Sequence, residues 1–368
     1  MRPVPRFVRN RHGILLMLMV TRAMARGMSL LTLAIFLSQS PVFAQYVPVK
    51  GVDLFGTRQI SVREIQQRFG DDIDKLVQSL EANEGWEFVD LYSKITLGIQ
   101  EMGKFAYAEI SPVIYFDKEK FCYVTIDIVE EKDRKRRMTF LPPPHKQFAD
   151  PDGLLATWYE YEETAIALIN KGELSVDKAH CPALNCVWGF DHPSLKRFQE
   201  AFQSKVPANI EKLRAILGED QVERHRARAV FLLAHTSDSQ KLVRMLLPSL
   251  KDSSVIVRKN VMQVLLQLAT RPDVVISVDP LLEVLEFPST NDRSKALLIL
   301  DSLSTREENK TTLIHKGSVR LIQILRLLQP NHHDYAYTIL KKISGKDFGE
   351  RNYKGWEQWL VRQRRIRR

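Results

Sequence analysis

The sequence predicts a mainly α-helical protein in which a C-terminal α-solenoid of two-helix repeats follows a small α+β domain. Strand patterns are found in residues 46–133, ahead of the repeats. The best repeat helix is Leu250–Leu268, and weaker copies surround it. The first members of the recurring pattern lie 32, 35 and 40 residues apart, which is typical of stacked helical hairpins. Arg258, Val261 and Leu265 recur as Arg226, Ala229 and Leu233, as Arg293, Ala296 and Leu300, and without the arginine as His333, Ala336 and Leu340.

The N-terminal segment, residues 1–44, has the features of a cleaved signal peptide. It contains six arginines, no acidic residue and a main apolar run, Met28–Leu37, which a second short apolar run, Ile14–Val20, precedes. Val42 and Ala44 stand at the −3 and −1 positions of a signal-peptidase site, which predicts cleavage before Gln45 and a periplasmic or secreted protein. The alternative is a membrane anchor, but the apolar run is only about half of the ~20 residues that span a bilayer.

The basic balance of the chain comes largely from this segment. The formal net charge is +10, and without the six arginines it falls to +4, so a nucleic-acid partner is not expected. A start at Met24 in place of Met1 gives a compact signal of ordinary shape. With 44% hydrophobic and 27% charged residues, the composition is that of a folded soluble protein, and 368 residues are enough for two or three domains.

Residues 46–133 show the pattern of one strand, two or three helices and two more strands. The first strand is expected over Val47–Leu54, and Ser61-Val-Arg-Glu is a capping-box variant that opens a helix. Gly70 predicts a break within that helix. A second helix and two strands joined by the polar turn Asp117-Lys-Glu-Lys are expected at Asp90–Met102, Ala106–Phe116 and Phe121–Val129.

This order of elements, with the Val-Lys-Gly start at Val49 and the Val-Glu-Glu end at Glu131, resembles the POTRA domain. POTRA domains are periplasmic modules of outer-membrane barrel-assembly and secretion proteins. The resemblance implies a fold of β-α-α-β-β order and binding by addition of a partner strand to an exposed sheet edge. The alternative is a small α+β domain that only packs on its neighbour.

Residues 134–149 have the composition of a charged, stiff linker. Arg134-Lys-Arg-Arg is followed by Pro142–Pro144, and three prolines exclude both a helix and a central strand. A solvated linker is expected. Contact of the basic cluster with anionic lipid headgroups is the alternative.

Residues 150–205 are predicted to form a helical cap region that includes a short cysteine loop. Apolar residues at helical spacing run from Asp150 to Asn170. Adjacent acidic residues on this helix are expected to point into water and to take no part in acid–base catalysis; they are Glu160, Glu162 and Glu163.

The cysteines are interpreted from the expected compartment. Cys181 and Cys186 flank a short loop, where an oxidising environment favours a disulfide. Two free thiols are one alternative. A metal site with His180 and His192 is another, although the spacing matches no common zinc module. Cys122, in an apolar strand pattern, is expected to be a buried thiol without chemistry.

Residues 206–345 resemble HEAT repeats, because Asp252, Val257 and Arg258 precede an apolar helix as they do in that signature. Asp252 is expected to cap the helix start. Arg258 is expected to reach a carbonyl or acid of the adjacent repeat, and Asp252, Arg226 and Arg293 are expected to stabilise the repeats with it. The first helices of the pairs are expected at Ile210–Leu217, Gln240–Leu250, Val278–Phe287 and Ser318–Leu328.

Aromatic residues are expected to close both ends of the stack. The segment with Trp188 and Phe190 resembles an element that precedes the repeats in exported bacterial HEAT-repeat proteins of unknown function, which implies an N-terminal cap. Residues 346–368 resemble a C-terminal cap of such proteins, with Trp356 and Trp359 covering the last repeat. The arginine-rich end is expected to be a solvated tail, with a weak contact to an anionic membrane surface as the alternative.

The expected function is that of a non-enzymatic interaction or scaffold protein of the bacterial cell envelope. Its protein partner is expected to bind on the concave face of the solenoid and by strand addition to the first domain. No residue is assigned a catalytic, metal-binding or cofactor-binding role, and no cofactor is expected. The alternatives are a small-ligand-binding protein and a lyase, since related HEAT-like proteins attach or remove bilins. Export and the lack of an evident nucleophile count against the lyase.

Overall fold

The computed structural model describes residues 46–175 and 181–365, so the predicted signal peptide lies outside the described residues. The chain divides into two compact units, 1–134 and 135–368. The fold is mainly helical with one small sheet near the N-terminus. Within the described ranges, no helix is long and apolar enough to cross a membrane.

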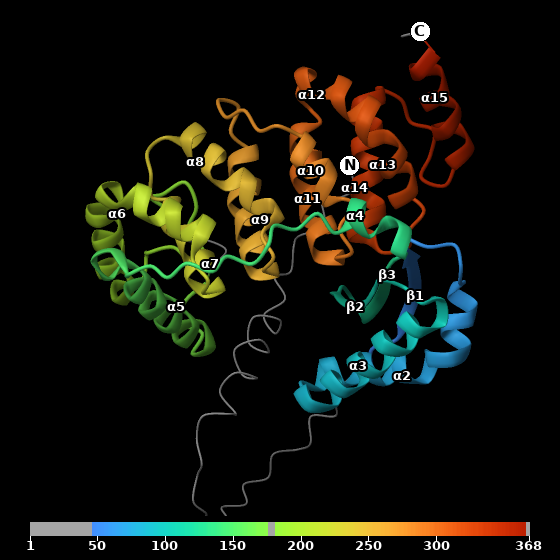
Figure 1. The fold of residues 1–368 in the computed structure, drawn as a ribbon, viewed down its shortest axis with the longest axis horizontal. Helices are drawn as coiled ribbons and strands as arrows, with labels where there is room; N and C mark the ends of the chain where they lie inside the picture. The colour runs from blue at the N-terminus through green and yellow to red at the C-terminus, as the bar shows by residue number, and fades with distance from the viewer. Residues whose placement is uncertain (1–45, 176–180, 366–368) are drawn as a thin grey trace, which may run out of the picture. The chain divides into compact units, whose positions relative to one another are not determined.

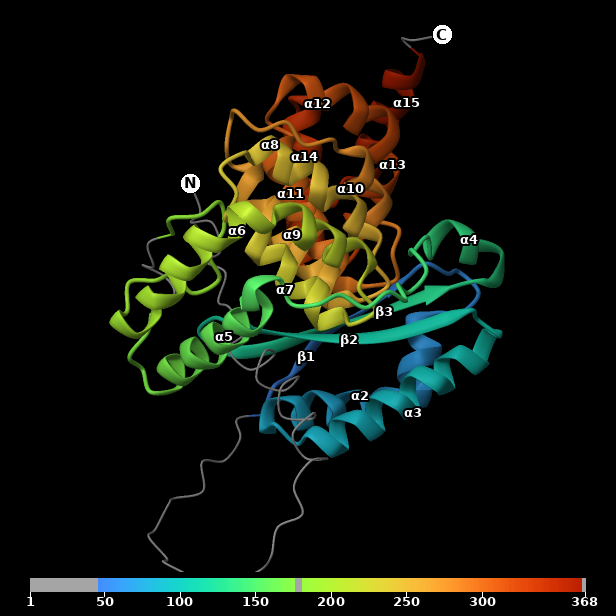
Figure 2. The ribbon, with the colours of Figure 1, turned by 60° about the vertical axis from the view of Figure 1, so that its left-hand side comes forward.

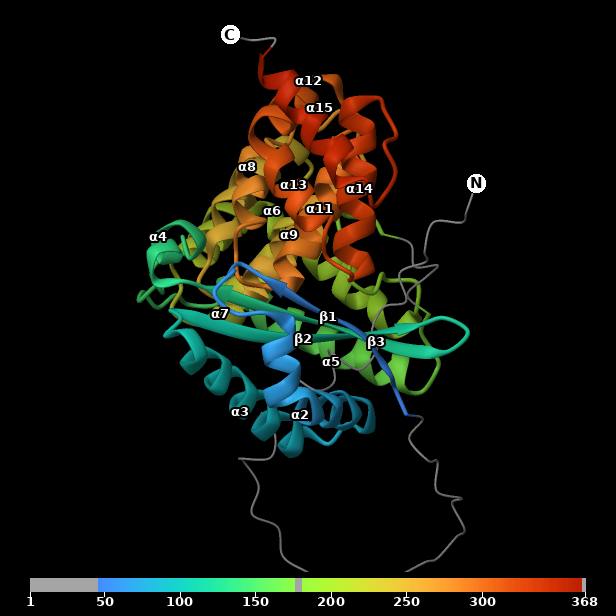
Figure 3. The same cartoon turned by 90° about the vertical axis from the view of Figure 1, so that its right-hand side faces the viewer.

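The N-terminal unit contains the predicted order of strand, two helices and two strands. The three strands form one mixed sheet in the order β1-β3-β2, with β1 parallel and β2 antiparallel to β3. Figure 3 shows the sheet with its two helices below it. The elements are β1 (Val49–Phe55), α2 (Val62–Ala82), α3 (Gly85–Gly103), β2 (Tyr107–Phe116), β3 (Lys120–Val129) and η1 (Glu131–Asp133).

The helices α2 and α3 cover one face of this sheet (Figure 2). Every second residue of β3 enters the core between the layers, as the two-residue period of a strand requires. The predicted capping box is confirmed, because the Ser61 hydroxyl accepts from the Glu64 amide and the Glu64 carboxylate accepts from the Ser61 amide. The predicted break at Gly70 is wrong. α2 runs unbroken through Gly70, since helical backbone costs a glycine only ~1 kcal/mol.

The second unit consists of helices and short turns. Its elements are α4 (Arg134–Arg137), η2 (Pro151–Gly153), α5 (Leu154–Asn170), α6 (Pro193–Glu219), α7 (Glu223–Leu233), α8 (Ser239–Leu246), η4 (Leu247–Lys251), α9 (Val255–Ala269), α10 (Asp279–Val284), α11 (Thr290–Leu303), α12 (Glu307–Thr312), η5 (Leu313–Gly317), α13 (Ser318–Ile324), α14 (Pro330–Ser344) and α15 (Tyr353–Arg365).

Four helices of this unit pack side by side in the order of the chain. α7 contacts α9, α9 contacts α11, and α11 contacts α14, as Figure 1 also shows from left to right. Each is preceded by a partner helix, namely α6, α8, α10 and α13. The first of these starts earlier than expected, because α6 begins at Pro193 and continues through Pro207, so the predicted boundary between 205 and 206 falls inside a helix.

The proline-rich segment after α4 is not a free linker. It runs in extended form across the helical unit from α4 to α5 (Figure 1). Its direction is opposite to the order of the row, which runs from α7 to α14. The amide of Leu141 donates to the Lys251 carbonyl (2.7 Å). Lys146 pairs with the turn between α6 and α7, where its carbonyl accepts from the Gln221 amide (2.7 Å). Prolines suit this role because they hold the chain extended without needing a donor. Residues 138–149 are called the strap below.

Candidate functional site

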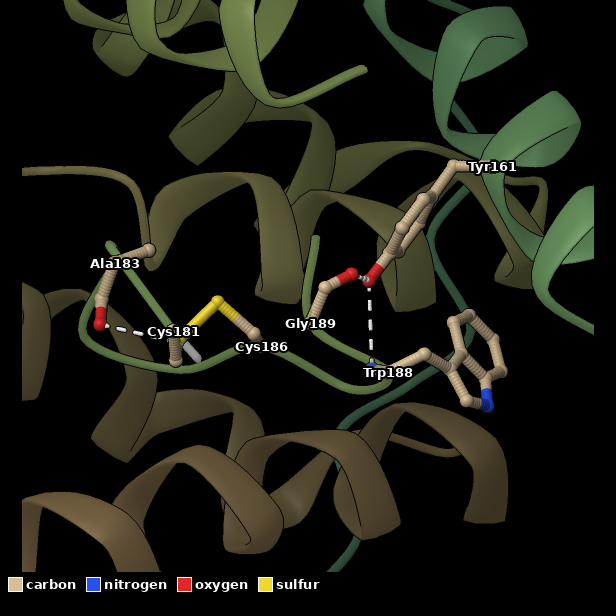
Figure 4. The surroundings of a disulfide bond; sticks show 6 residues. All are labelled: Tyr161, Cys181, Ala183, Cys186, Trp188 and Gly189. Atoms are coloured by element: carbon tan, nitrogen blue, oxygen red, sulfur yellow. Dashed lines mark hydrogen bonds between the residues drawn. A yellow bond between two sulfur atoms is a disulfide. The ribbon is translucent and has the colours of Figure 1, made fainter. Parts of the chain in front are cut away.

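The cysteine loop closes the first end of the helical unit. Cys181 and Cys186 form the predicted disulfide, with Cα atoms 5.4 Å apart (Figure 4). Sulfurs bonded to each other are not thiolate ligands, so the metal alternative does not apply to this form. His180 lies outside the described residues, and the His192 imidazole accepts from the Ser194 amide at the start of α6. Cys122 is buried, and burial raises its thiol pKa to about 12, so it is protonated at neutral pH.

Trp188 and Phe190 lie in an aromatic cluster that joins the loop to α5, α6 and α7. The Tyr161 ring is central: its centroid lies 5.4 Å from Trp188 and 5.1 Å from Phe190. The Tyr161 hydroxyl donates to the Gly189 carbonyl (2.9 Å) and accepts from the Trp188 amide (3.3 Å), as Figure 4 shows. These paired bonds fix the loop on the helices. The cluster therefore forms the apolar end of the unit.

His235 is the one titratable imidazole of this aromatic cluster within the described residues. Its ring centroid lies 5.2 Å from that of Phe202 and 6.0 Å from that of Phe190. Burial lowers the pKa of His235 to about 4, because the charged imidazolium would lose its hydration there. The side chain is therefore neutral at neutral pH.

The acidic residues of α5 differ in their exposure and in their partners. Glu162 forms an ion pair with Arg228 (3.3 Å), and burial raises its pKa. Glu160 lies 3.6 Å from Arg197, with both side chains exposed. The expectation that these glutamates point into water therefore holds for Glu160 but is wrong for Glu162, because Arg228 holds the Glu162 carboxylate against the helical unit.

A buried ion pair connects α7 to the turn before α9. Both Nε and Nη2 of Arg226 donate to the Asp252 carboxylate, each at 2.8 Å, and Nη1 donates to the Asp220 carbonyl. The expectation that Asp252 caps α9 is wrong. The N-cap position belongs to Ser254, and the Asp252 carboxylate accepts from the Ser254 amide outside the helix. The bidentate bond to Arg226 orients the carboxylate in this position.

A second buried pair connects α9 to α11. Arg258 donates through Nε (2.9 Å) and Nη2 (2.8 Å) to Asp292, and through Nη1 to the Asp252 carbonyl. The arginine side chain is 3% exposed and the aspartate 0%. Burial raises the pKa of Asp292, and the Arg258 charge partly opposes this effect. The strap covers the pair, because the Phe140 ring lies 4.5 Å from the guanidinium of Arg258 and 4.7 Å from the Phe287 ring.

The third arginine, Arg293, is fully buried between α11 and α14. Its Nη2 donates to the Phe287 carbonyl (3.4 Å), six residues earlier, as the other two arginines do to their own turns. The imidazole of His332 is buried beside it, with Nε2 3.3 Å from the Thr290 carbonyl. Burial lowers the pKa of His332 well below its usual value, and the Arg293 charge adds to this.

Trp356 and Trp359 lie buried at the other end of the unit. The Trp356 indole donates to the Gly349 carbonyl (3.0 Å), and its ring meets Phe348 edge to face at 4.9 Å. The two tryptophan rings are 6.2 Å apart, and α15 packs on α13. Apolar side chains therefore cover both ends of the row of helices.

The helices α7, α9, α11 and α14 are the second helices of their pairs, and α9 and α11 each have a line of half-exposed side chains. On α9 and α11 these residues follow helical spacing, so they share a face of each helix. We call them the second-helix face: Lys259, Gln263, Leu266, Lys295, Leu298 and Ser302.

A hollow of about 440 Å³ lies between α6 and α8. Three of its side chains are cationic, but the Glu211 carboxylate forms ion pairs with Arg214 (2.8 Å) and Lys241 (3.1 Å). Within residues 46–175 and 181–365, no three His, Cys, Asp or Glu side chains converge as a metal site requires. The hollow is lined by Glu211, Arg214, Leu217, Gly218, Lys241, Arg244, Met245, Pro248 and Ser249.

The two outer strands of the sheet differ in their free edges. The Cys122 amide donates to Pro48 on the β1 side, so alternate residues of β3 bond to β2, in pairs such as Val113 with Tyr123. The even-numbered residues of β2 therefore face outward, and Pro112 among them has no N–H. In β1 a bulge between Val49 and Gly51 shifts the register, and after it the amides of Val52 and Leu54 turn outward. Both edges are therefore interrupted, the β2 edge by Pro112 and the β1 edge by this bulge, and β1 keeps outward amides beyond the interruption.

Comparison with known proteins adds no family to this description. No protein-family model matches the chain, and no curated protein matches it.

Proposed function

We propose that this protein is a non-enzymatic binding or scaffold protein of the bacterial cell envelope. It is exported by a signal peptide that is removed before Gln45, and its helical unit is a short HEAT-like solenoid. The observation that carries the proposal is the row of α7, α9, α11 and α14, tied by buried arginine–aspartate pairs and covered by apolar residues at both ends. Stacked helical pairs of this kind present an extended concave surface, and such surfaces typically bind other proteins.

The second-helix face is the proposed contact surface. Its half-exposed residues lie on adjacent helices, so one partner can touch α9 and α11 together. Gln263 offers hydrogen bonds, whereas Leu266 and Leu298 offer apolar contact, and a polar surface with a few apolar residues is usual for non-obligate interfaces. The buried ion pairs between α7, α9 and α11 keep the spacing of these helices, and so of these side chains, fixed.

The N-terminal unit is proposed to be POTRA-like and to add a partner strand at β1. The outward amides of Val52 and Leu54 supply donors for such a strand, whereas Pro112 removes one from the β2 edge. An exported location agrees with the disulfide between Cys181 and Cys186, since such bonds persist in oxidising compartments.

An affinity capture tests the proposal. The mature chain, from Gln45, is tagged and incubated with envelope extract, and bound molecules are measured by mass spectrometry. The variant Gln263→Glu/Leu298→Glu changes the second-helix face without touching the core, and Lys354→Glu on α15 is the matched control. A stoichiometric protein that is lost with the double variant and kept with the control supports the function. Recovery of only a small molecule contradicts it.

A further inference from the structure

The N-terminal unit has an exposed apolar line that its own fold does not use. Trp86 of α3 is 70% exposed, whereas the other four tryptophans are buried. Leu97 is 60% exposed and Val89 41%. Single exposed apolar residues are ordinary on a protein surface, but several on one line mark an interaction site more often.

These three side chains share one face of α3. Each helical residue advances by about 100°, so Leu97 returns to within about 20° of Trp86 after eleven residues. Val89 and the exposed Ser93 fill the space between them along the helix. The opposite face of α3 holds Ile95 and Ile99 in the core of the unit, so the exposed line is a second, separate apolar face.

The charges along this line are acidic. Glu87, Asp90 and Glu101 are exposed on one flank of the apolar residues. The lysine of the same flank, Lys94, is held by Asp72 of α2 at 2.8 Å. The pKa of Glu84, at the start of the helix, is raised mainly by a hydrogen bond with the Glu87 side chain, and the charge of Glu87 adds to this effect. The flank is therefore a concentrated negative charge beside an apolar line.

We propose that this face of α3, which we call the Trp86 face, binds a basic amphipathic helix of a partner protein. An apolar line flanked by acid fits a helix whose apolar residues recur at three- and four-residue spacing beside lysine or arginine. The negative charge of this flank would repel an anionic membrane surface, so a lipid surface is the less favoured occupant. The net charge of the chain is positive, so attraction of a basic helix arises from this local flank and not from the whole molecule. The Trp86 face would be a second contact surface beside the second-helix face, so this proposal rests on the proposed binding function.

A peptide titration tests it on the whole mature protein. The probe is an 18-residue synthetic helix of leucine and lysine with its leucines on one face, and the control probe replaces every lysine by glutamate. Trp86 is the reporter, because excitation at the red edge favours exposed indole and the other tryptophans are buried. The lysine peptide is expected to shift the emission to the blue, to protect Trp86 from acrylamide and to bind at least about tenfold more tightly than the glutamate peptide.

Variants separate the charge from the apolar contact. The triple variant Glu87→Lys/Asp90→Lys/Glu101→Lys is expected to lose at least about tenfold in affinity for the lysine peptide. Glu119→Lys, in the exposed turn between β2 and β3, is expected to change it less than twofold. Leu97→Ser is expected to weaken binding with little effect on the melting temperature, because the side chain is exposed.

Three results would overturn the inference. They are an unchanged Trp86 emission, equal affinity for both peptides, and a blue shift with vesicles of anionic phospholipid but not with the lysine peptide. A chain that captures its envelope partner through the second-helix face but ignores the peptide loses only this inference. A chain that does neither loses the proposed function as well.

Discussion

The two units of the molecule bury different groups at their helix interfaces. In the N-terminal unit, the core between the helices and the sheet is apolar, with members such as Ile65, Ile95 and Ile126, and the Glu81–Lys120 ion pair lies at its half-exposed margin. In the helical unit, the interfaces between α7, α9 and α11 contain arginines and aspartates that are almost fully buried.

The difference follows from what fixes the register of each unit. Strands are held in register by their backbone hydrogen bonds and by the alternation of their side chains between the two faces of the sheet. Helices have no backbone bonds to spare for their neighbours, so only their side chains determine how adjacent helices align. The directional bonds of Arg226 and Arg258 add a fixed geometry to the apolar contacts between neighbouring helices. Each also reaches a carbonyl of its own turn, so one guanidinium fixes two elements.

The largest expected effect comes from breaking one of these pairs. Arg258→Met leaves Asp292 buried without its partner, which is expected to lower the free energy of unfolding by about 3–5 kcal/mol. Urea unfolding followed by circular dichroism measures it. Arg258→Met/Asp292→Leu removes both charges and is expected to recover most of the loss. Arg214→Met breaks only an exposed pair with Glu211, and a loss above about 1 kcal/mol there would show that burial is not the cause.

A pH change is expected to weaken the helical unit through His235. The unfolded imidazole takes up a proton near pH 6.5, whereas the folded one stays neutral down to about pH 4. The unfolded state therefore binds more protons in this window, and stability falls as the pH falls, by up to about 3 kcal/mol at pH 4. Well above pH 6.5 both states are neutral at this group, and it contributes no pH dependence. The measurement compares urea unfolding of the parent and His235→Phe at pH 7, 5 and 4, and parallel curves would contradict the assignment.

Removal of the disulfide is expected to cost less. Cys181→Ser/Cys186→Ser frees a loop whose cysteines are five residues apart, and closure of such a short loop stabilises a fold by about 2 kcal/mol. The loss should disappear when parent and variant are compared under reducing conditions. A melting temperature that does not change on oxidation would place the loop outside the cooperative unit.

Two glycines of the N-terminal unit give the smallest and most closely matched test. A methyl group at Gly98 of α3 would approach the Phe69 ring to 2.6 Å, so Gly98→Ala is expected to destabilise by about 1 kcal/mol. At Gly70 of α2 nothing lies within 4 Å, so Gly70→Ala is expected to stabilise by about 0.5–1 kcal/mol through the helix propensity of alanine. Thermal unfolding measures both, and equal effects would contradict the packing described for α2 and α3.

Local patterns predicted the N-terminal unit well. Alternation located all three strands, and the capping box located the start of α2, because both signals depend on residues close in the sequence. They did not predict the strap. Its prolines specify extended backbone but do not reveal that Leu141 and Lys146 bond to turns more than seventy residues away. Local patterns also did not identify Asp292 as the partner of Arg258. The two aspartates stand at unlike positions in their repeats, because Asp252 lies six residues before Arg258 whereas Asp292 directly precedes Arg293.

The Trp86 face was missed for a related reason. Its apolar residues continue the pattern of a helix that also has a buried face, and one sequence does not tell which face packs on the sheet. The arrangement of α2 and α3 decides it, by placing Ile95 and Ile99 inward and Leu97 outward.

Site-specific photo-crosslinking tests the proposed function most directly. A photoreactive phenylalanine is placed at Gln263 of the second-helix face, and at Lys354 of α15 as the control, in chains expressed from the full sequence. Irradiation of intact cells is predicted to join the Gln263 chain to one protein in high yield and to leave the Lys354 chain free. Equal crosslinking at the two positions, or none at either, would contradict a role as a binding scaffold.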